Sequence, residues 1–552
     1  MYFTLAVSAT TPAACAALAD RARIADPAVM PVPGPPVVVW RSGDGRAAML
    51  RWGGSPGDET VLAAATAGTG GATVTSHGGT IWAGQPTPGS GHAPVYARTS
   101  VTRVDPVYVA EVPGAVIIAD RATWAAATAG SLRDHDPLQA CALLNPGFPL
   151  GSMTPFRSVS ALPPATILHL LSGILTTSAA PRDAAVSGSD GASSGGGPRE
   201  VAAALVAAVT PLRSASAPVE LSLTGGKDSR LVAAALVAAG VAVRAQTHGF
   251  AGHWDVVIAA EVAARLGIEH TVTTPAAPGQ KTDVIGRIRG TVLVADGMLS
   301  AFENVGRPNP VRSSAVTCGG HGGELLRGGY AEAAAGRRGR LPAPVRAGEL
   351  LRRLTTGHLR LLRRGAAASY VASLAPWTTA LARGPLQALD DFYLVNRAGR
   401  WSAAARQAYL IRESLVQPLF DDEVVLAARA VPLATRVSGE LTRAVLLELC
   451  PALKDVPLAG KSGPPNVSAP LEATFDWRRQ YGGEIASFLR DYTLDNGTAG
   501  GLFDVVSRTA AEKALAAPQA DRATVWALAT LACLTSGDYR NARESAQLLS
   551  VS

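Results

Sequence analysis

The pattern of apolar and polar positions divides the chain into a sheet-rich part and a part in which strands and helices alternate. Up to residue 176, short apolar runs such as residues 36–41 and 115–119 are separated by Gly, Pro and Thr turns, which predicts short strands. Residues 1–7 predict the first of these strands. From residue 199 strand-like and helix-like runs alternate, and from Glu349 onward the pattern is mainly helical. The pattern therefore predicts an α/β protein with a sheet-rich, layered N-terminal domain.

A change in composition separates the two parts. Residues 177–198 are rich in Ser, Gly and Ala, which is typical of a linker. We therefore predict an N-terminal domain over residues 1–176, a linker over 177–198 and a C-terminal domain over 199–552. No internal repeat is found along the chain.

Composition and charge exclude several classes of protein. The 552 residues are 47% hydrophobic and 17% charged, which indicates a globular chain with room for two or more domains. The net charge of +7 is mild for this length, and no aromatic residues interleave with the basic ones, so nucleic-acid binding is not predicted. No run of eighteen apolar residues predicts a membrane span, and residues 1–7 lack the basic start of a signal peptide.

Two further features bear on compartment and partners. The five cysteines are scattered without metal-binding or disulfide spacing, which predicts a reducing, cytoplasmic environment. Nine arginines crowd residues 337–364. They predict either a solvated helix face or a docking surface for an acidic peptide or carrier partner.

Residues 224–230, Thr-Gly-Gly-Lys-Asp-Ser-Arg, follow an apolar run and precede a helical one. A strand that turns through two glycines onto a helix N-terminus presents backbone N–H groups and the positive end of the helix dipole to an anion. Asp228 would repel a phosphate there unless a metal ion lay between them. The segment predicts a site for a nucleotide polyphosphate and Mg²⁺, with an ordinary strand-to-helix turn as the alternative. A Walker A loop is excluded, because its first glycine would fall at Leu221.

This segment resembles the pyrophosphatase loop, Ser-Gly-Gly-x-Asp-Ser, of the asparagine synthetase superfamily of ATP pyrophosphatases. Downstream, residues 248–250 follow a second strand-like run, and Asp255 precedes a helix that Asp255 is expected to cap and Gly267 to end. This unit resembles the adenine side of the family's nucleotide site. The nucleotide-binding residues that the resemblance implies in these segments are Leu223, Thr224, Gly225, Gly226, Asp228, Ser229, His248 and Gly249.

Residues 319–330, Gly-Gly-His-Gly-Gly-Glu-Leu-Leu-Arg-Gly-Gly-Tyr, resemble the family's loop Ser-Gly-Glu-Gly-Ser-Asp-Glu-x-x-Gly-Gly-Tyr. Glu324 falls where the family has an Asp that shares Mg²⁺ with the first loop. The resemblance therefore implies Asp228 and Glu324 as metal ligands, although Leu325 replaces the next acidic residue. It also implies that the loop bends around the α-phosphate at Gly320, Gly322 and Gly323. A glycine-rich surface loop is the alternative for this segment alone.

His321 is the departure from the family with the largest chemical consequence. It takes the position where asparagine synthetases carry Glu and β-lactam synthetases carry a catalytic Tyr. An imidazole with an ordinary pKa of about 6.5 is suited to take a proton from an attacking ammonium group. We predict a catalytic His321, with a structural hydrogen-bond donor as the alternative.

A third element lies near the C-terminal side. Residues 417–423, Gln-Pro-Leu-Phe-Asp-Asp-Glu, lead into a helix over 424–430, and Lys461 lies in a stretch flanked by Gly and Pro. This resembles the family's signature Pro-Phe-x-Asp-x-Glu followed by a Lys on a flexible loop. The resemblance implies that Lys461 contacts phosphate and the oxyanion formed during attack on the acyl-adenylate. Lys454 is the competing lysine.

The N-terminal part carries segments at residues 105–108, 150–157 and 161–164 that resemble the synthetases' amidohydrolase-like domain. The resemblance implies an Ntn-amidohydrolase-like αββα domain followed by an α/β ATP-pyrophosphatase domain, of the adenine nucleotide α-hydrolase-like type, with helical additions. Glutamine-hydrolysing members need a free N-terminal Cys whose α-amine activates the thiol. Here Tyr2 follows Met1 and the nearest cysteine is Cys15. We therefore expect a degenerate domain that makes no ammonia from glutamine.

The resemblance implies ATP-dependent amide-bond formation: adenylation of a substrate carboxylate, attack by an amine of the substrate, and release of AMP and pyrophosphate. β-Lactam synthetases, carbapenam synthetases and lasso peptide cyclases follow this pattern. We favour a lasso peptide macrolactam (isopeptide) cyclase of natural-product biosynthesis, with ATP and Mg²⁺ as cofactors. Its partners would be a precursor peptide and a leader peptidase or precursor-recognition protein.

Other functions remain open. Within the class, the alternatives are a β-lactam- or carbapenam-type or other small-molecule amide synthetase, and an asparagine synthetase-like enzyme without glutaminase activity. Outside it, the chain could be a non-catalytic scaffold that binds a nucleotide or peptide, which retention of Asp228, Glu324 and Lys461 argues against. An ATP pyrophosphatase that activates a carbonyl or thiolates a base is disfavoured by the loop at 319–330 and by the N-terminal domain.

Overall fold

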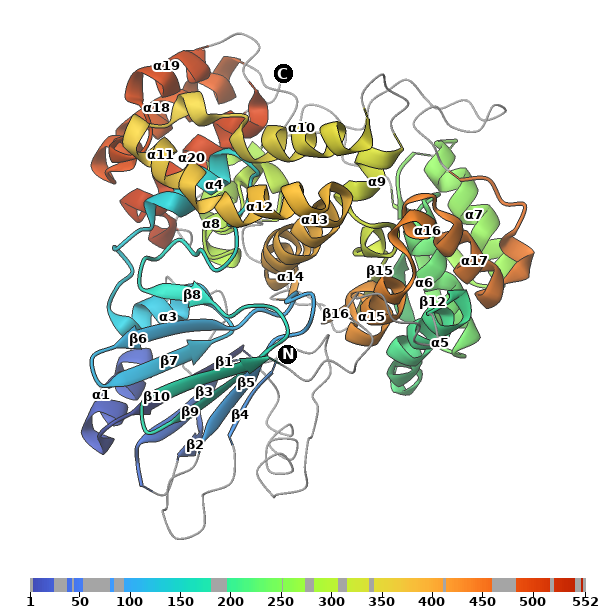
Figure 1. The fold of residues 1–552 in the computed structure, drawn as a ribbon, viewed down its shortest axis with the longest axis horizontal. Helices are drawn as coiled ribbons and strands as arrows, with labels where there is room; N and C mark the ends of the chain where they lie inside the picture. Colours follow the sequence, from blue (N-terminus) through green and yellow to red (C-terminus); the bar gives the residue numbers. More distant parts are fainter. Residues whose placement is uncertain are drawn as a thin grey trace.

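The computed structural model describes residues 3–23, 37–41, 44–52, 80–83, 94–179, 196–250, 252–273, 282–305, 315–336, 342–410, 414–458, 483–516, 521–541 and 548–549. Within them the chain forms a mixed α/β structure, as predicted (Figure 1). No helix among these residues is long and apolar enough to span a bilayer.

Two antiparallel sheets form the N-terminal layers (Figure 1). One has the strand order β2-β3-β1-β7-β6-β8 and the other the order β10-β9-β5-β4. The strands are β1 (Phe3–Ala9), β2 (Val37–Arg41), β3 (Ala47–Trp52), β4 (Thr80–Ala83), β5 (Val95–Arg98), β6 (Tyr108–Val112), β7 (Ala115–Ala119), β8 (Val159–Ala161), β9 (Thr166–Leu171) and β10 (Ile174–Ala179). The strands predicted at residues 36–41 and 115–119 are thus confirmed as β2 and β7.

Alternation along the strands explains the layers, because successive side chains point to opposite faces of a sheet. Ile118 of β7 is fully buried between the two sheets, where Leu168 and Leu170 also lie. Its neighbour Ile117 points to the other face, which is covered by α1 (Pro12–Arg23) and α3 (Ala122–Ala129). Helix α4 (Pro137–Leu144) belongs to the same hydrophobic cluster. Most residues of β10 are exposed. Among the described residues, the helical layer of the predicted αββα arrangement therefore covers the six-stranded sheet.

A five-stranded parallel sheet organises the C-terminal part (Figure 1). Its order is β13-β12-β11-β15-β16, and every neighbouring pair is parallel. The strands are β11 (Val219–Ser222), β12 (Val243–His248), β13 (Glu269–Thr273), β15 (Val316–Gly319) and β16 (Ser414–Val416). Helices α5 (Pro198–Val209), α6 (Lys227–Ala238), α7 (Trp254–Leu266), α15 (Asp422–Ala430) and α17 (Glu440–Leu449) share one core with the sheet.

The two faces of this sheet differ. Leu221 of β11 and Ala245 of β12 are fully buried against the helices, whereas the adjacent Ser222 and Gln246 point to the opposite face and are exposed. Parallel sheets are normally buried on both faces, so exposed polar residues on a central strand are unusual. The second face of the sheet is therefore a candidate for ligand binding.

Helices dominate from residue 343 onward, as predicted from Glu349, although the short strand β16 interrupts them. The remaining helices are α8 (Val284–Val294), α9 (Tyr330–Ala335), α10 (Ala343–Thr356), α11 (Arg364–Ser373), α12 (Ala375–Arg383), α13 (Pro385–Phe392), a π-helix (Tyr393–Ser402), α14 (Ala403–Leu410), α16 (Leu433–Val437), α18 (Gly483–Ala499), α19 (Arg508–Ala516) and α20 (Arg522–Ser536). Two short strands, β14 (Thr282–Asp283) and β17 (Leu548–Leu549), pair outside the main sheets.

Buried polar contacts join the N-terminal layers to the helices. Arg103 is 1% exposed and donates to the carbonyl oxygens of Gly151 and Leu162 on one side and of Val395 and Gly399 in the π-helix on the other. One hydrophobic cluster also runs from the six-stranded sheet and α3 through α8, α14 and α20. The predicted domain division stays a prediction: β10 ends at Ala179, α5 begins at Pro198, and residues 180–195 lie outside the described ranges.

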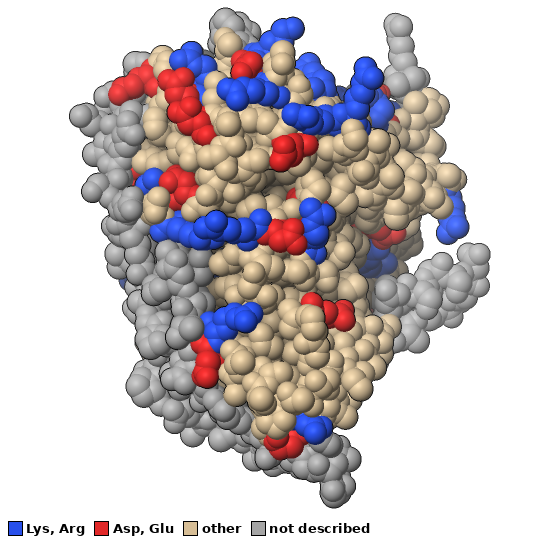
Figure 2. All heavy atoms as spheres, turned by 90° about the vertical axis from the view of Figure 1, so that its left-hand side faces the viewer, with Lys and Arg blue, Asp and Glu red and all other residues tan. Residues whose placement is uncertain are grey.

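Six arginines of the predicted basic region are described, from Arg346 to Arg364. Arg346 donates to the backbone oxygens of Ala334 and Ala335, whereas Arg352, Arg353, Arg360, Arg363 and Arg364 are exposed. Figure 2 shows Lys and Arg gathered on the upper, helical part of one side of the molecule, with fewer charges over the sheets below. Whether this surface binds an acidic partner stays a prediction.

Candidate active site

The first glycine loop connects β11 to α6 and is held by its own side chains. The backbone N–H of Thr224 donates to Ser229 Oγ (3.1 Å), and that of Gly226 donates to Thr224 Oγ1 (3.2 Å). The N–H of Gly225 donates to Asp255 Oδ1 (3.0 Å). No side chain caps the start of α6, so the first-turn N–H groups and the helix dipole face outward from a preformed loop.

The prediction that Asp255 caps α7 is wrong. His253 is the N-cap, and its Nδ1 accepts the N–H of Asp255 at 3.2 Å. Asp255 lies inside the first turn, where its carboxylate is free to reach across to Gly225. It therefore fixes the glycine loop as well as favouring the helix N-terminus. The predicted helix end is confirmed, because Gly267 adopts a left-handed conformation with φ 68°.

The second glycine loop packs directly on the first. It follows β15 and continues into a 3₁₀ helix, η5 (Gly323–Arg327). A Cβ added to Gly320 would lie against the backbone nitrogen of Ser229, closer than real Cβ atoms approach, and one added to Gly323 would overlap the carboxylate of Asp228. Glycine is therefore required at Gly320 because the two backbones touch, and at Gly323 because the Asp228 side chain fills the space. The structure thus brings together the residues predicted from two segments far apart in the sequence.

Replacing Gly320 tests this close approach. We expect Gly320→Ala to push the second loop away from Ser229 and weaken ATP binding at least about tenfold, because overpacking a tight contact typically costs about 1–3 kcal/mol. Gly319→Ala is the matched control, since its Cβ would meet His321 Nδ1 at an ordinary 3.4 Å. Calorimetric titration with ATP measures both variants. Equal affinity in the two would show that the loop contact is not needed for binding.

Four charged side chains link the two loops. Arg327 forms ion pairs with both Asp228 and Glu332; its Nε lies 2.9 Å from Glu332 Oε2, and its second terminal nitrogen lies 3.3 Å from Asp228 Oδ2. Lys227 Nζ lies 3.0 Å from Glu332 Oε1. Burial raises the pKa of Asp228 above its usual value; the charge of Arg327 opposes this shift and that of Glu324 adds to it. The two loops are therefore joined by alternating opposite charges.

The predicted ligands fit a Mg²⁺ ion whose remaining ligands come from the nucleotide and from water. Among the described residues, no group of three or more His, Cys, Asp or Glu side chains could hold a metal. Asp228 and Glu324 supply two hard oxygen ligands, and Glu324 is near enough to raise the pKa of Asp228. The other ligands would have to be phosphate oxygens and water, as is usual for Mg²⁺ at nucleotide sites. Arg327 already contacts both oxygens of Asp228.

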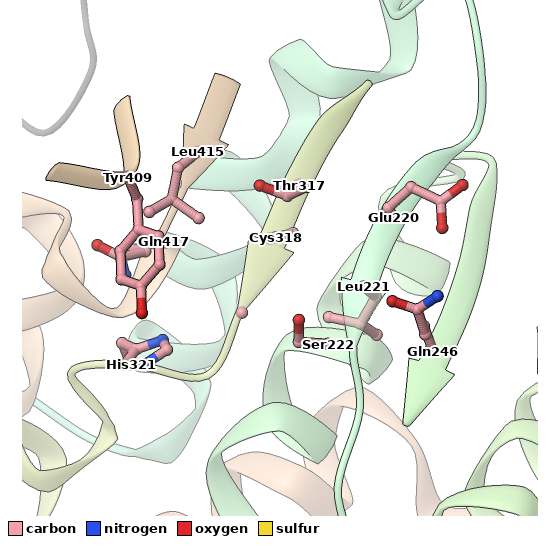
Figure 3. A pocket seen from close by; sticks show the side chains of 11 residues that line it. Glu220, Leu221, Ser222, Gln246, Thr317, Cys318, His321, Tyr409, Leu415 and Gln417 are labelled. Carbon is pink, nitrogen blue, oxygen red and sulfur yellow. The ribbon is translucent and has the colours of Figure 1, made fainter. Parts of the chain in front are cut away.

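A cavity of about 260 Å³ opens over the polar face of the parallel sheet beside these loops (Figure 3). His321 and Gln417 lie at its end near the glycine loops, and Glu220 and Gln246 lie across the sheet from them. The lining residues are Glu220, Leu221, Ser222, Gln246, Thr317, Cys318, Gly319, His321, Tyr409, Leu415 and Gln417. Polar and apolar groups both line the cavity around an accessible imidazole, which suits a substrate with both kinds of group.

His321 keeps a solvent-accessible edge at this cavity. Desolvation by the surrounding protein lowers the pKa of its imidazole; the charge of Glu324 opposes the shift and that of Arg397 adds to it. A lowered pKa means that the ring is neutral, and able to accept a proton, over a wider range of pH. The position and the pKa direction are both consistent with the predicted base.

Residues 200–455 match a protein-family model described as Asparagine synthase. The matched region contains the parallel sheet, both glycine loops and the π-helix. Residues 200–455 belong to the asparagine synthetase superfamily. The resemblance predicted from the sequence is confirmed at this level, and the family indicates an ATP-dependent carbon–nitrogen ligase. Comparison with curated proteins gives no match.

In this asparagine synthase-like region, a buried arginine ties the first loop to the segment that leads toward the predicted lysine. Arg230 donates to the carbonyl oxygens of Gly225 (3.3 Å), Val456 (2.8 Å) and Pro457 (2.7 Å). Lys461 lies outside the described residues, which stop at 458 and resume at 483. Lys454 is described and exposed. The choice between the two lysines stays a prediction.

The two residues predicted to lie on the adenine side, His248 and Gly249, stand at the end of β12 and directly after it. His248 is exposed at the end of the strand, and the N–H of Gly249 donates to the carbonyl oxygen of Thr273 at 3.0 Å. A Cβ on Gly249 would press on the side chain of Val256. Both residues therefore lie at the same edge of the sheet as the first loop, as the superfamily resemblance implies.

The π-helix brings to this site residues that the sequence did not indicate. The ring of Tyr393 contacts Tyr330 edge-on at 5.0 Å and lies where a Cβ on Gly329 would fall. Arg397 stacks over the Trp401 ring at 3.4 Å. Burial lowers the pKa of His321 and raises the pKa of Tyr330 and Tyr393; the charge of Arg397 adds to the first shift and opposes the other two. Runs of π-helix are frequently found at functional sites. The sequence shows only an ordinary helical period here, so no signal indicated them.

The signature segment after β16 predicts a pH-dependent stability. Asp421 caps α15, and the next residue, Asp422, accepts the N–H of Val101 at 2.8 Å and lies 3.3 Å from Arg98. Burial raises the pKa of Asp422 to about 6, against the effects of Val101 and Arg98. The folded protein thus holds this proton more tightly than the unfolded chain does. The contribution to stability is present below about pH 4 and is lost as the pH rises through about 6.

Asp422→Asn should remove this dependence. We expect the melting temperature of the variant minus that of the unsubstituted protein to be several degrees higher at pH 8 than at pH 4.5. Asparagine can still accept the hydrogen bond from Val101 but carries no buried charge. Scanning calorimetry at the two pH values measures the difference. The same relative melting temperature at both would contradict the raised pKa.

Proposed function

We propose that this chain activates a substrate carboxylate with ATP and joins it to an amine carried by the same substrate. The observation that carries the proposal is the direct packing of the two glycine loops, Gly320 on Ser229 and Gly323 on Asp228, beside a polar cavity. The loops that bind phosphate and the cavity that binds the acyl group would then lie side by side. Superfamily membership over residues 200–455 supports the use of ATP.

The reaction would begin at the N-terminus of α6. The phosphates of ATP would lie over Gly225, Gly226 and Ser229, with the adenine toward His248 and Gly249. Asp228 and Glu324 would hold Mg²⁺, which supplies charge neutralisation for the polyphosphate when bound. The substrate carboxylate attacks the α-phosphorus, a carboxylate–phosphorus bond forms, and the bond to pyrophosphate breaks. The product of this step is an acyl-adenylate.

Amide formation would follow in the cavity. The substrate amine attacks the acyl carbon, the nitrogen gives up a proton to neutral His321, and AMP leaves with the electron pair of the acyl–oxygen bond. A cation is required near the developing oxyanion. We assign this role to Lys461, with Lys454 as its competitor. Desolvation lowers the pKa of His321, with Arg397 adding to the shift, which supports a neutral imidazole before the attack.

The absence of an activated cysteine supports an amine that comes from the substrate. Cys15 and Cys141, the cysteines of the N-terminal layers, are buried, and burial raises the pKa of Cys141 to about 12. A nucleophilic thiol needs exposure and a lowered pKa. We therefore infer that residues 1–176 form a degenerate Ntn-amidohydrolase-like domain and residues 199–552 an ATP-pyrophosphatase-like domain.

For the substrate we propose a peptide, which would make the protein a lasso-type macrolactam cyclase. The cavity is open along the sheet face, so a peptide could place one acidic side chain beside His321 while the rest of its chain lies outside. The exposed arginines at residues 352–364 offer a surface for an acidic precursor segment. The leader peptidase or recognition protein stays a predicted partner.

A small-molecule amide synthetase is the second candidate, and the cavity volume favours it. About 260 Å³ is close to the lower end of pockets that enclose whole small ligands. Such a substrate would carry both its carboxylate and its amine inside the cavity. The two candidates share the same reaction and differ only in whether part of the substrate lies outside the cavity.

Substrate-dependent ATP–pyrophosphate exchange tests the proposal. The panel contains a linear peptide with a free α-amine and an internal Asp or Glu, the same peptide with Asn or Gln there, and small amino-dicarboxylates. Exchange only with the acidic peptide supports the cyclase, and exchange only with small molecules supports the second candidate. Nucleotide binding without exchange for any carboxylate would leave a scaffold as the better description and overturn the enzyme proposal.

A further inference from the structure

Arg327 is the residue at this site for which the superfamily resemblance gives no role, because it falls at an unspecified position of the second loop. It is 5% exposed and ends the 3₁₀ helix η5. Its terminal nitrogens contact both carboxylate oxygens of Asp228 and the carbonyl oxygen of Gly323 (3.1 Å), while its Nε contacts Glu332. All three nitrogens of the guanidinium are therefore engaged.

These contacts place a permanent positive charge at the carboxylate that a metal ion would need. Arginine stays protonated at any physiological pH, and its planar fork matches both oxygens of a carboxylate. Burial by itself lowers the pKa of Arg327, but Asp228 and Glu332 outweigh it and raise the pKa overall. Arg327 and Lys227 together balance the charges of Asp228 and Glu332, so Asp228 already has a paired cation without any added ion, and Glu324 adds one further negative charge nearby.

The guanidinium paired with Asp228 makes a divalent ion there unfavourable on its own. An ion at Asp228 would have to displace the guanidinium from at least one oxygen and would then lie a few ångströms from it. Like charges at that distance repel, and the mostly buried arginine would lose part of its compensation from Asp228 and keep only that from Glu332. A polyphosphate changes the balance, because its negative charge accommodates both cations at once.

We propose that Arg327 is a built-in competitor for the metal position, which occupies Asp228 in the nucleotide-free protein and yields to a divalent ion only when ATP enters. This inference rests on the proposed nucleotide site. It makes Arg327 a positioning residue that couples ion binding to nucleotide binding. By linkage, whatever factor the nucleotide adds to ion affinity the ion adds to nucleotide affinity.

A purely structural arginine would behave differently. If Arg327 only held the loops together, its removal would loosen the site and weaken ion binding along with stability. Competition predicts the opposite for the ion. Without the guanidinium, Asp228 loses its ion-pair partner, and its carboxylate and that of Glu324 should then bind a divalent ion. The sign of the change in ion affinity therefore separates the two roles.

The test is direct titration of the nucleotide-free full-length chain with Mn²⁺, a paramagnetic substitute for Mg²⁺ whose free form is counted by electron paramagnetic resonance. We expect Arg327→Met to bind Mn²⁺ at least about tenfold more tightly than the unsubstituted protein, within the range of typical coupling factors. Adding the α,β-methylene analogue of ATP should narrow that gap. Lys227→Met is the matched control, because it removes a cation that pairs with Glu332 but not with Asp228. It should keep the weak binding.

Equal Mn²⁺ affinity in the unsubstituted protein and Arg327→Met would overturn the proposal. So would a gain in Lys227→Met as large as that in Arg327→Met, since it would reflect charge loss alone. If Arg327→Met does not fold, Arg327→Lys replaces it: a lysine cannot bridge both oxygens and Glu332, so its affinity should rise about threefold, and no rise would overturn the proposal. No substrate enters this titration. A gain in Mn²⁺ affinity together with absent pyrophosphate exchange would therefore reject the proposed reaction and keep the competition.

Discussion

Asp228→Asn is expected to reduce ATP–pyrophosphate exchange by about 10²–10³-fold, the usual cost of removing one electrostatic contact to a reacting phosphate or oxyanion. The change keeps the shape of the side chain but removes the charge that would hold Mg²⁺ beside the polyphosphate. The fold should survive it, because Arg327 retains Glu332 at 2.9 Å and the carbonyl oxygen of Gly323 at 3.1 Å. Exchange and thermal melting are measured on the same preparation.

Glu332→Gln is the control for Asp228→Asn. It removes the other carboxylate that Arg327 contacts but no predicted metal ligand. We expect it to lower the melting temperature by a similar amount while it retains most of the exchange. Comparable loss of exchange in both variants would mean that loop packing, and not the metal-binding carboxylate, limits the reaction. Full exchange in Asp228→Asn would contradict the proposed nucleotide site.

The largest loss of stability should come from Asp296→Ala, at the contact between the N-terminal layers and α8. Asp296 and Arg121 are both fully buried, and their ion pair is 2.5 Å long. The same carboxylate accepts the backbone N–H of Ala122 at 2.8 Å and the hydroxyl of Thr123 at 2.8 Å. Its removal leaves a buried guanidinium without its carboxylate. Breaking a buried pair in this way typically costs about 3–5 kcal/mol.

Chemical denaturation measures this loss as a shift of the midpoint toward lower denaturant, because a chain of this size need not unfold in one step. Asp134→Ala is the matched control. It breaks an ion pair with Arg157 of 3.0 Å in which the side chains are 52% and 61% exposed. Exposed pairs contribute about 0–1 kcal/mol, so the midpoint should hardly move. Equal shifts in the two variants would show that the Arg121–Asp296 contact does not hold the parts together.

Local sequence patterns predicted the elements around the site well. Two glycines after an apolar run predicted the turn from β11 into α6, and Gly267 predicted the end of α7. These features depend on residues within one turn of each other. The family resemblance rested on the same short motifs, which is why the superfamily was identified from the sequence.

Contacts between distant segments were not predictable in the same way. Arg327 reaches Asp228 across 99 positions, and Arg230 reaches Val456 across 226. Nothing in either neighbourhood indicates the partner, because an arginine beside a glycine loop is equally suited to solvent. The sequence predicts Asp255 as a cap because caps are local, whereas in the fold its carboxylate contacts Gly225. The charged network of the site therefore emerges only from the fold.

The cluster that runs from the six-stranded sheet into α20 has a consequence for how the gene can change. Leu5, Trp124, Ile288 and Trp526 belong to the same continuous packing, so each half of the chain supplies part of the other's interior. Separating the two parts at residues 177–198 would expose these buried apolar residues to solvent, where they would promote aggregation. Selection against aggregation alone would then preserve the N-terminal layers, whether or not they retain any chemistry of their own.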